Sequence, residues 1–179
     1  MAIDADTKLI LSFYAGKRVG DAAFEFIGDL ALRLSNRVQL TSDGHKPYLE
    51  AVEGAFSADI DYAMLIKIYG DAGAPGGRYS PTPCMGAKKK AIEGSPDPKH
   101  ISTSYVERAN LTTRMGNRRF TRLTNAFSKA ENQAHPVAIH VMLYNLVRIH
   151  QTLRCSPTTA AGVSVKFWEL ADMVKVLED

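Results

Sequence analysis

The sequence predicts a mixed α/β fold in which helices cover a sheet. Strand-like and helix-like patterns alternate over the first 70 residues, whereas helical patterns follow one another from about residue 103 to the end. The 179 residues, 45% hydrophobic and 23% charged, suit one globular domain with a real core. This order favours a sheet flanked by helices over a helical bundle.

The first elements are expected to be a hairpin and a helix. Apolar runs at 2–5 and 9–14 are separated by a short polar segment, which is typical of two strands joined by a turn, so the chain is expected to open inside a sheet. Over 19–35 the apolar residues share one helical face, and an acid lies near the start, where a helix favours it. The face consists of Ala23, Phe26, Ile27, Leu30 and Leu34.

The middle of the chain predicts two more strands around a short helix. The strand at 38–41 ends at Asp43-Gly44, the helix covers 47–56 with Pro47 in its first turn, and the apolar run at 62–69 reads as a buried strand. The segment 70–99 contains six glycines and five prolines, so we expect a long loop there, carrying Lys88, Lys89 and Lys90.

The remainder predicts helices at 103–120, 125–151 and 165–177, with Pro157 separating the last two. The last helix shows one apolar face, formed by Phe167, Leu170, Ala171, Val174 and Leu177. We therefore expect a domain at 1–155, with 70–99 as an inserted loop, and a helical extension at 156–179.

Composition excludes several classes of protein. No segment reaches the roughly 18 uncharged apolar residues of a membrane span, and the first residues lack the features of a secretion signal, so we expect a cytoplasmic protein without a membrane partner. Cys84 and Cys155 are far apart and have no metal-ligand spacing. They predict free thiols, and any metal would be held by oxygen.

The net charge of +3 is unevenly distributed. Residues 1–90 contain 11 basic and 11 acidic side chains, whereas 99–154 contain nine basic side chains against Glu107 and Glu131. Such an excess attracts phosphate backbones, although a solvated helical face has the same composition. We interpret it as a nucleic-acid surface.

Two acidic residues stand where a metal-dependent phosphoryl-transfer site would need them. Asp43 follows an apolar strand, at the sheet edge where open α/β sheets bind ligands. The alternative is a turn aspartate, since Asp-Gly is a common turn. Glu107 falls in the first turn of a helix, with Asn110, Leu111 and Arg114 on its face. The alternative there is a capping box formed with Ser104.

Basic residues follow Glu107 without an intervening acid up to residue 130. Arginines along a helix and its exit suit phosphate oxygens and would position DNA without reading its sequence. Phe120 lies among them and is expected to pack rather than to stack on a base. The tract consists of Arg108, Arg114, Arg118, Arg119, Arg122 and Lys129.

A third motif, Tyr144-Asn145 to His150-Gln151-Thr152-Leu153, ends a helix that is apolar nearly all round and is therefore expected to be buried. Its polar side chains could face a site or brace the helix end, and we favour the bracing role.

Together these motifs resemble a known family. The segment at 40–48, which contains Asp43, the segment at 105–111, which contains Glu107, and the motif at 144–153 look like the catalytic core of bacterial insertion-sequence transposases, closest to the insertion-sequence-one type. The resemblance implies an RNase H-like fold in which two aspartates and a glutamate bind two Mg²⁺ (or Mn²⁺) ions for DNA strand cleavage and transfer. By motif match, Asp43 is the second aspartate and Glu107 the glutamate.

The first aspartate of that family has no clear counterpart. It lies on the first strand of the sheet, and residues 2–14 look like the second and third strands, so we expect the chain to begin one strand late and to show weak or no strand transfer by itself. Asp4 and Asp6 are the only upstream acids, and Asp4 is the remaining candidate. An uncovered strand edge would also favour aggregation.

The resemblance implies DNA partners, namely transposon ends and target, a homo-oligomer or a full-length transposase, and a nucleoid-associated location. Two alternatives stay open. The chain could be a non-catalytic DNA-binding or dimerising fragment that interferes with a complete transposase, or a nuclease acting on RNA–DNA hybrids.

Overall fold

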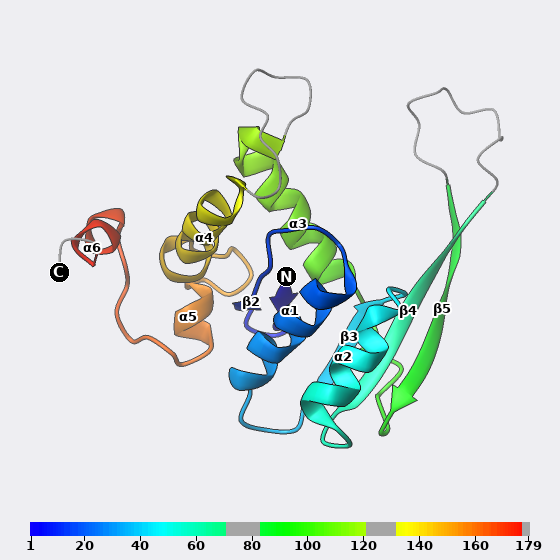
Figure 1. The fold of residues 1–179 in the computed structure, drawn as a ribbon. Coiled ribbons are helices and arrows are strands. Elements are labelled where there is room, and N and C mark those ends of the chain that lie inside the picture. Colours follow the sequence, from blue (N-terminus) through cyan, green and yellow to red (C-terminus); the bar gives the residue numbers. More distant parts are fainter. Residues whose placement is uncertain (71–82, 121–131, 177–179) are drawn as a thin grey trace. The chain divides into compact units, whose positions relative to one another are not determined.

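A computed structural model describes residues 1–70, 83–120 and 132–176 of the chain. The fold is mixed α/β, with a three-stranded mixed sheet flanked by helices (Figure 1). The chain divides into two compact units, one formed by Met1–Ala22 with Ser104–Asp179 and the other by Ala23–Thr103. The predicted extension at 156–179 lies within the first unit.

The second unit contains the sheet and two helices. Strands β3 (Gln39–Asp43), β4 (Asp61–Tyr69) and β5 (Cys84–Glu93) are ordered β3-β4-β5, with β3 and β4 parallel and β4 and β5 antiparallel. Helix α2 (Pro47–Phe56) connects the parallel pair, as a parallel connection requires. The expected helix at 47–56 and the expected strands at 38–41 and 62–69 are confirmed.

Buried apolar side chains of α1 (Gly20–Leu32), α2 and β4 form the interior of this unit. The predicted face of α1 is correct, since four of its five residues are buried and Leu34 lies just beyond the helix end. The aromatic rings of Phe26 and Tyr48 pack with centroids 6.2 Å apart. The buried residues are Ala23, Phe26, Ile27, Leu30, Ala51, Val52, Ile60, Tyr62, Ala63 and Met64.

The prediction of a loop throughout 70–99 is wrong for residues 84–93, which form β5. The register pairs Tyr62 with Glu93 at one end and Tyr69 with Cys84 at the other. Nine of the ten residues of β5 are exposed, so the side chains show none of the apolar alternation from which strands are recognised. The strand is held by backbone hydrogen bonds to β4, which composition does not reveal.

The first unit opens with the expected hairpin. Strands β1 (Ala2–Ile3) and β2 (Ile10–Ser12) pair antiparallel and form a two-stranded sheet of their own, hydrogen-bonded to neither β3 nor β4. The turn is closed by backbone hydrogen bonds between Asp4 and Leu9 and between Lys8 and Asp4. The expectation that the chain opens inside a sheet is met by this two-stranded sheet.

Helices complete the first unit. They are α3 (Ser104–Gly116), a 3-10 turn (Arg118–Phe120), α4 (Ala134–Met142) with a π-helical turn (Leu143–Val147), α5 (Pro157–Ala160) and α6 (Leu170–Lys175). One core cluster joins β2 to α4 and its π turn through Ile10, Val137, Val141 and Tyr144. Phe120 packs against this cluster, which confirms its predicted packing role.

Two predicted helix boundaries are wrong. Within the described residues, the helix expected at 125–151 begins at Ala134, and residues 125–131 lie outside them. It leaves helical geometry after Val147, because Arg148 adopts an extended backbone, and Ile149 is then exposed. The helix expected at 165–177 begins at Leu170, because Glu169 caps it in a reciprocal capping box with Asp172. Phe167 thus precedes the helix, and Leu177 lies outside the described residues.

Among the described residues, every helix is too short or too polar to cross a bilayer.

Candidate functional site

Asp43 is the last residue of β3 and lies exposed at the carboxyl end of the parallel pair. Its Oδ1 accepts a hydrogen bond from the backbone N–H of His45 at 3.1 Å, so the carboxylate closes a tight turn. A structural role in the turn is therefore compatible with a role as a site residue, because one carboxylate oxygen accepts the turn hydrogen bond while the side chain stays exposed. This edge is where open α/β sheets bind ligands.

The sheet register places a lysine on the face of the sheet that Asp43 occupies. Asp43 is opposite Leu65 of β4, and Leu65 is opposite Lys89 of β5. Residues that are directly opposite share a face, so Asp43 and Lys89 lie two strand spacings apart, about 10 Å. The Nζ of Lys89 donates a hydrogen bond to the carbonyl of Pro98 at 2.5 Å.

The other face of the sheet carries a part-buried pair of hydroxyl groups beside the same edge. The hydroxyls of Ser42 and Tyr62 are 2.7 Å apart. Burial raises the pKa of Tyr62, and the nearby negative charge of Asp43 adds to this rise against the opposing hydrogen bond with Ser42. Tyr62 thus remains a neutral hydrogen-bonding group next to the strand end.

Glu107 lies in the first turn of α3 and is exposed. The predicted face it shares with Asn110, Leu111 and Arg114 is exposed throughout, whereas Ala109 and Thr113 are buried on the opposite side. The helix therefore packs through the small residues Ala109 and Thr113, and the face that contains Glu107 is exposed to solvent.

The described arginines of the basic tract are exposed as well. Arg108 and Arg114 lie on α3, and Arg118 and Arg119 lie in the 3-10 turn that follows it. Gln133, almost fully buried, donates from its side-chain amide to the carbonyl of Arg119 at 3.2 Å and so supports that turn. Arg122 and Lys129 lie outside the described residues.

The carboxylate of Asp4 lies in the hairpin turn and accepts hydrogen bonds there. Its Oδ2 accepts hydrogen bonds from the N–H and the hydroxyl of Thr7, at 3.0 and 2.5 Å. Burial raises the pKa of Asp4, but these hydrogen bonds outweigh that effect and the pKa is lowered. A metal-ligand role for Asp4 would compete with these bonds.

Within the described residues, no group of three or more His, Cys, Asp or Glu side chains is gathered closely enough to hold a metal ion. Asp43 belongs to the second unit, and Asp4 and Glu107 belong to the first.

The motif at 144–153 contributes a structural residue that sequence reasoning only partly identified. The side-chain oxygen of Asn145 accepts from the N–H of Ile10 at 3.0 Å, and its amide nitrogen donates to the carbonyl of Ile10 at 2.9 Å. The favoured bracing role is confirmed for Asn145. Its target was hidden because 135 residues separate the partners.

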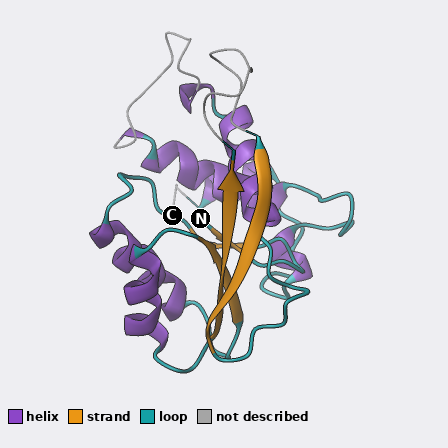
Figure 2. Cartoon of the chain, turned by 90° about the vertical axis from the view of Figure 1, so that its right-hand side faces the viewer, coloured by secondary structure: helices purple, strands orange, loops and turns teal. Residues whose placement is uncertain are grey.

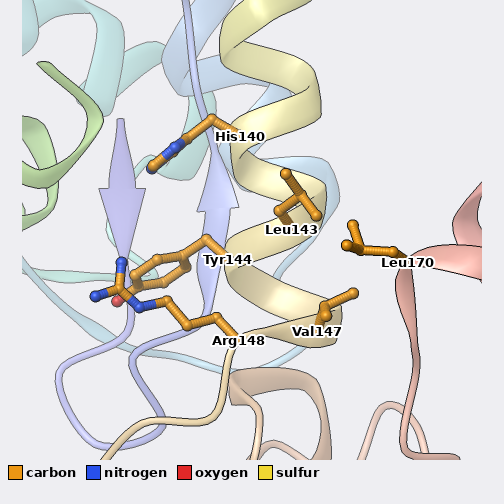
Figure 3. Close-up of a pocket in the computed structure, with 6 residues that line it drawn as sticks. All are labelled: His140, Leu143, Tyr144, Val147, Arg148 and Leu170. Atoms are coloured by element: carbon orange, nitrogen blue, oxygen red, sulfur yellow. The ribbon is translucent and has the colours of Figure 1, made fainter. Parts of the chain in front are cut away.

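A pocket of about 240 Å³ opens beside the same motif (Figure 3). The side chains of His140 and Arg148 lie on either side of Tyr144, and three aliphatic side chains form the remaining wall. The lining residues are His140, Leu143, Tyr144, Val147, Arg148 and Leu170. None of the described lining residues is an acid, so this part of the chain offers the pocket no carboxylate ligand for a metal.

The surroundings of two histidines near Tyr144 favour the neutral form of each imidazole. The Nε2 atoms of His140 and His150 are buried without a hydrogen-bond partner in the described part of the chain. Burial, followed by the charge of Arg148, lowers the pKa of each, and Lys8 adds to the effect at His150. The rings of Tyr144 and His150 pack edge to face with centroids 4.8 Å apart, which indicates a packing role.

Comparisons with protein-family models, curated proteins and solved structures gave no match to this chain.

Proposed function

We propose that the chain is a DNA-acting domain of the RNase H-like, DDE transposase type, which uses Asp43 and Glu107 as carboxylate ligands and the exposed arginines as phosphate contacts. The observation that carries the proposal is the position of Asp43, exposed at the carboxyl end of a parallel strand whose motif resembles that of the transposases. The exposed Glu107 face of α3 and the arginines after it support the same function.

The residues have separate roles in this proposal. Asp43 and Glu107 supply carboxylate oxygens, the donors that Mg²⁺ and Mn²⁺ prefer. The guanidinium groups of Arg108, Arg114 and Arg118 bind phosphate oxygens through rigid paired donors and hold the DNA backbone. Arg119 and Arg122 extend this contact.

The two carboxylates fit a divalent metal in their chemistry, since both are exposed oxygen donors. When bound, Mg²⁺ or Mn²⁺ supplies activation of the attacking hydroxyl and stabilisation of the leaving oxygen. The arginines lower the electrostatic cost of bringing phosphates to two carboxylates.

A non-catalytic DNA-binding or dimerising role is the second candidate. It is favoured by the use of the Asp4 carboxylate in the hairpin turn, because this occupies the candidate for a third acidic ligand. In that role the basic surface would bind DNA, or the chain would join a complete transposase without cutting.

Two assays on the full chain test the proposal. We expect affinity for duplex DNA to fall steeply as salt rises, because phosphate contacts release counterions. We expect Mg²⁺- or Mn²⁺-dependent cleavage to be lost in Asp43→Asn and Glu107→Gln and kept in the exposed controls Asp59→Asn and Glu53→Gln.

The outcomes separate the candidates. Salt-sensitive binding without metal-dependent cleavage would support the non-catalytic role. A purely monomeric chain with no salt-sensitive affinity for DNA would contradict both roles.

A further inference from the structure

Strand β5 and the end of β4 form a two-stranded ribbon that is exposed on both faces. Strand β3 pairs with β4 only as far as Leu65, opposite Asp43, whereas β4 and β5 remain paired up to Tyr69 and Cys84. Residues 66–69 of β4 with 84–88 of β5 therefore continue past the end of β3 for about 13 Å. We define the ribbon as this extension together with Lys89 and Lys90 at its base, and its strands are the two long ones in Figure 2.

The side chains of the ribbon are open to solvent. Ile66, Ile68 and Tyr69 of β4 are 37, 52 and 57% exposed, and Met85 of β5 is 71% exposed. A strand in a globular domain ordinarily buries at least one face. The ribbon is therefore a surface for which the described residues provide no cover.

The charge along the ribbon and its base is of one sign. The paired residues 63–69 and 84–91 contain four lysines and no acid, and the first acid of β5 is Glu93, opposite Tyr62. Lys88 and Lys90 are opposite Ile66 and Met64 and share one face, whereas Lys89 is opposite Leu65 and lies on the face of Lys67 and Asp43. Both faces of the paired strands thus carry positive charge.

We propose that the ribbon binds the phosphate backbone of duplex DNA, with Lys88 and Lys90 as its main contacts, and holds the duplex at the sheet edge that bears Asp43. This inference rests on the proposed function and adds a second phosphate-binding element, separate from the arginines of α3. The ribbon begins level with Asp43, so DNA lying along it runs to that edge.

Duplex DNA fits the ribbon better than a second protein strand does. The major groove admits a two-stranded β-ribbon, and phosphate contacts need repeated cations rather than a shaped pocket. Pairing of β5 with the edge of another chain would bring together rows of lysines, and lysine is a residue that edge strands carry to prevent such pairing.

One contact ties the ribbon to the turn after Asp43. A Cβ added at Gly44 would lie 3.3 Å from Cγ1 of Ile66, so the glycine allows the first ribbon residue to pack directly on this turn. The ribbon and Asp43 are thereby held together within one unit.

Fluorescence anisotropy with a short duplex of mixed sequence tests the inference. The variant Lys88→Gln/Lys90→Gln is compared with Lys17→Gln/Lys175→Gln, which removes the same charge from exposed positions outside the ribbon. We expect the ribbon variant to lower the slope of log affinity against log salt by about two, and affinity near 0.1 M salt by about tenfold or more. The control should match the wild type, and circular dichroism should show that both variants fold.

Three outcomes would overturn the inference. The first is an equal loss of DNA affinity in the two variants, and the second is an unchanged DNA affinity in the ribbon variant. The third is a concentration-dependent dimer, seen by sedimentation, that disappears in Lys88→Gln/Lys90→Gln. The tests also separate the two proposals. If the Lys88→Gln/Lys90→Gln variant binds DNA as the wild type does, only the proposed role of the ribbon is contradicted. If DNA binding depends on the ribbon but Asp43 and Glu107 bind no Mn²⁺, only the proposed metal site is contradicted.

Discussion

Asn145 shows how one side chain can take the place of a strand. Its amide makes both of the hydrogen bonds that a neighbouring strand would make with Ile10, whose side chain is only 4% exposed and belongs to the core cluster of the first unit. Buried backbone groups need such partners, since an unpaired one costs free energy comparable to a lost hydrogen bond. The short hairpin is therefore fixed to the helical part of its unit by a residue far along the chain.

We expect Asn145→Ala to lower the free energy of unfolding by about 2 to 4 kcal/mol, because two backbone groups of Ile10 lose their partners. Chemical denaturation followed by circular dichroism measures the change. Asn110→Ala, at an exposed helical position of the same unit, should not lower stability, since alanine favours the helix. A variant at Asn145 as stable as the wild type would show that the bracing contact contributes little.

At the scale of elements, a charged network fixes the end of the sheet opposite Asp43. Arg37, just before β3, donates to both carboxylate oxygens of Asp61 at 3.1 and 2.8 Å, and the N–H of Ser95 donates to Asp61 at 2.8 Å. Between them, Gly94 has φ +66°, and a Cβ there would lie 2.2 Å from Asp61 Oδ1. The turn after β5 therefore requires glycine, and the network joins the ends of all three strands.

This network predicts a dependence of stability on acid pH. The hydrogen bond from Arg37, followed by that from Ser95, lowers the pKa of Asp61 to about 2, below its ordinary value of about 4. A lowered pKa stabilises the folded state above the unfolded pKa, and this contribution is lost as pH falls toward the folded value.

The free energies of unfolding of the wild type and of Asp61→Asn should therefore show their full difference above about pH 5, and the difference should shrink as the pH approaches about 2. The difference should also shrink at high salt, because the pair is exposed to solvent. A difference that is independent of pH over this range would contradict the assignment.

The elements that could be predicted from sequence are those whose signals are local. Pro47 at the start of α2 and the apolar run of β4 are such signals, and both elements lie close to their expected positions. Strand β5 could not be predicted, because an exposed strand needs no apolar pattern and takes its stability from pairing with β4. The start of α6 was missed because its cap is Glu169, a residue rarely chosen for that position.

The residues of the candidate site likewise differ in whether local sequence signals predict their positions. The position of Asp43 at a strand end and that of Glu107 in the first turn of a helix follow from local sequence patterns and are found as expected. The lysines at 88–90 could be noted in sequence, but only the register with β4 places Lys89 on the face of Asp43. The partner of Asn145 depends on long-range packing and has no sequence signal.

At the scale of the whole molecule, the proposed function assigns one carboxylate ligand to each compact unit. Asp43 comes from the unit that carries the sheet and its basic ribbon, and Glu107 from the unit that carries the exposed arginines. The proposed function requires that each of these acids bind a divalent metal ion.

Binding of Mn²⁺ to the full chain, followed by electron paramagnetic resonance, tests that requirement most directly. We expect Asp43→Asn and Glu107→Gln each to weaken Mn²⁺ binding by at least about tenfold. Asp59→Asn and Glu53→Gln should bind as the wild type does. Undiminished Mn²⁺ binding in both Asp43→Asn and Glu107→Gln would contradict the proposed function.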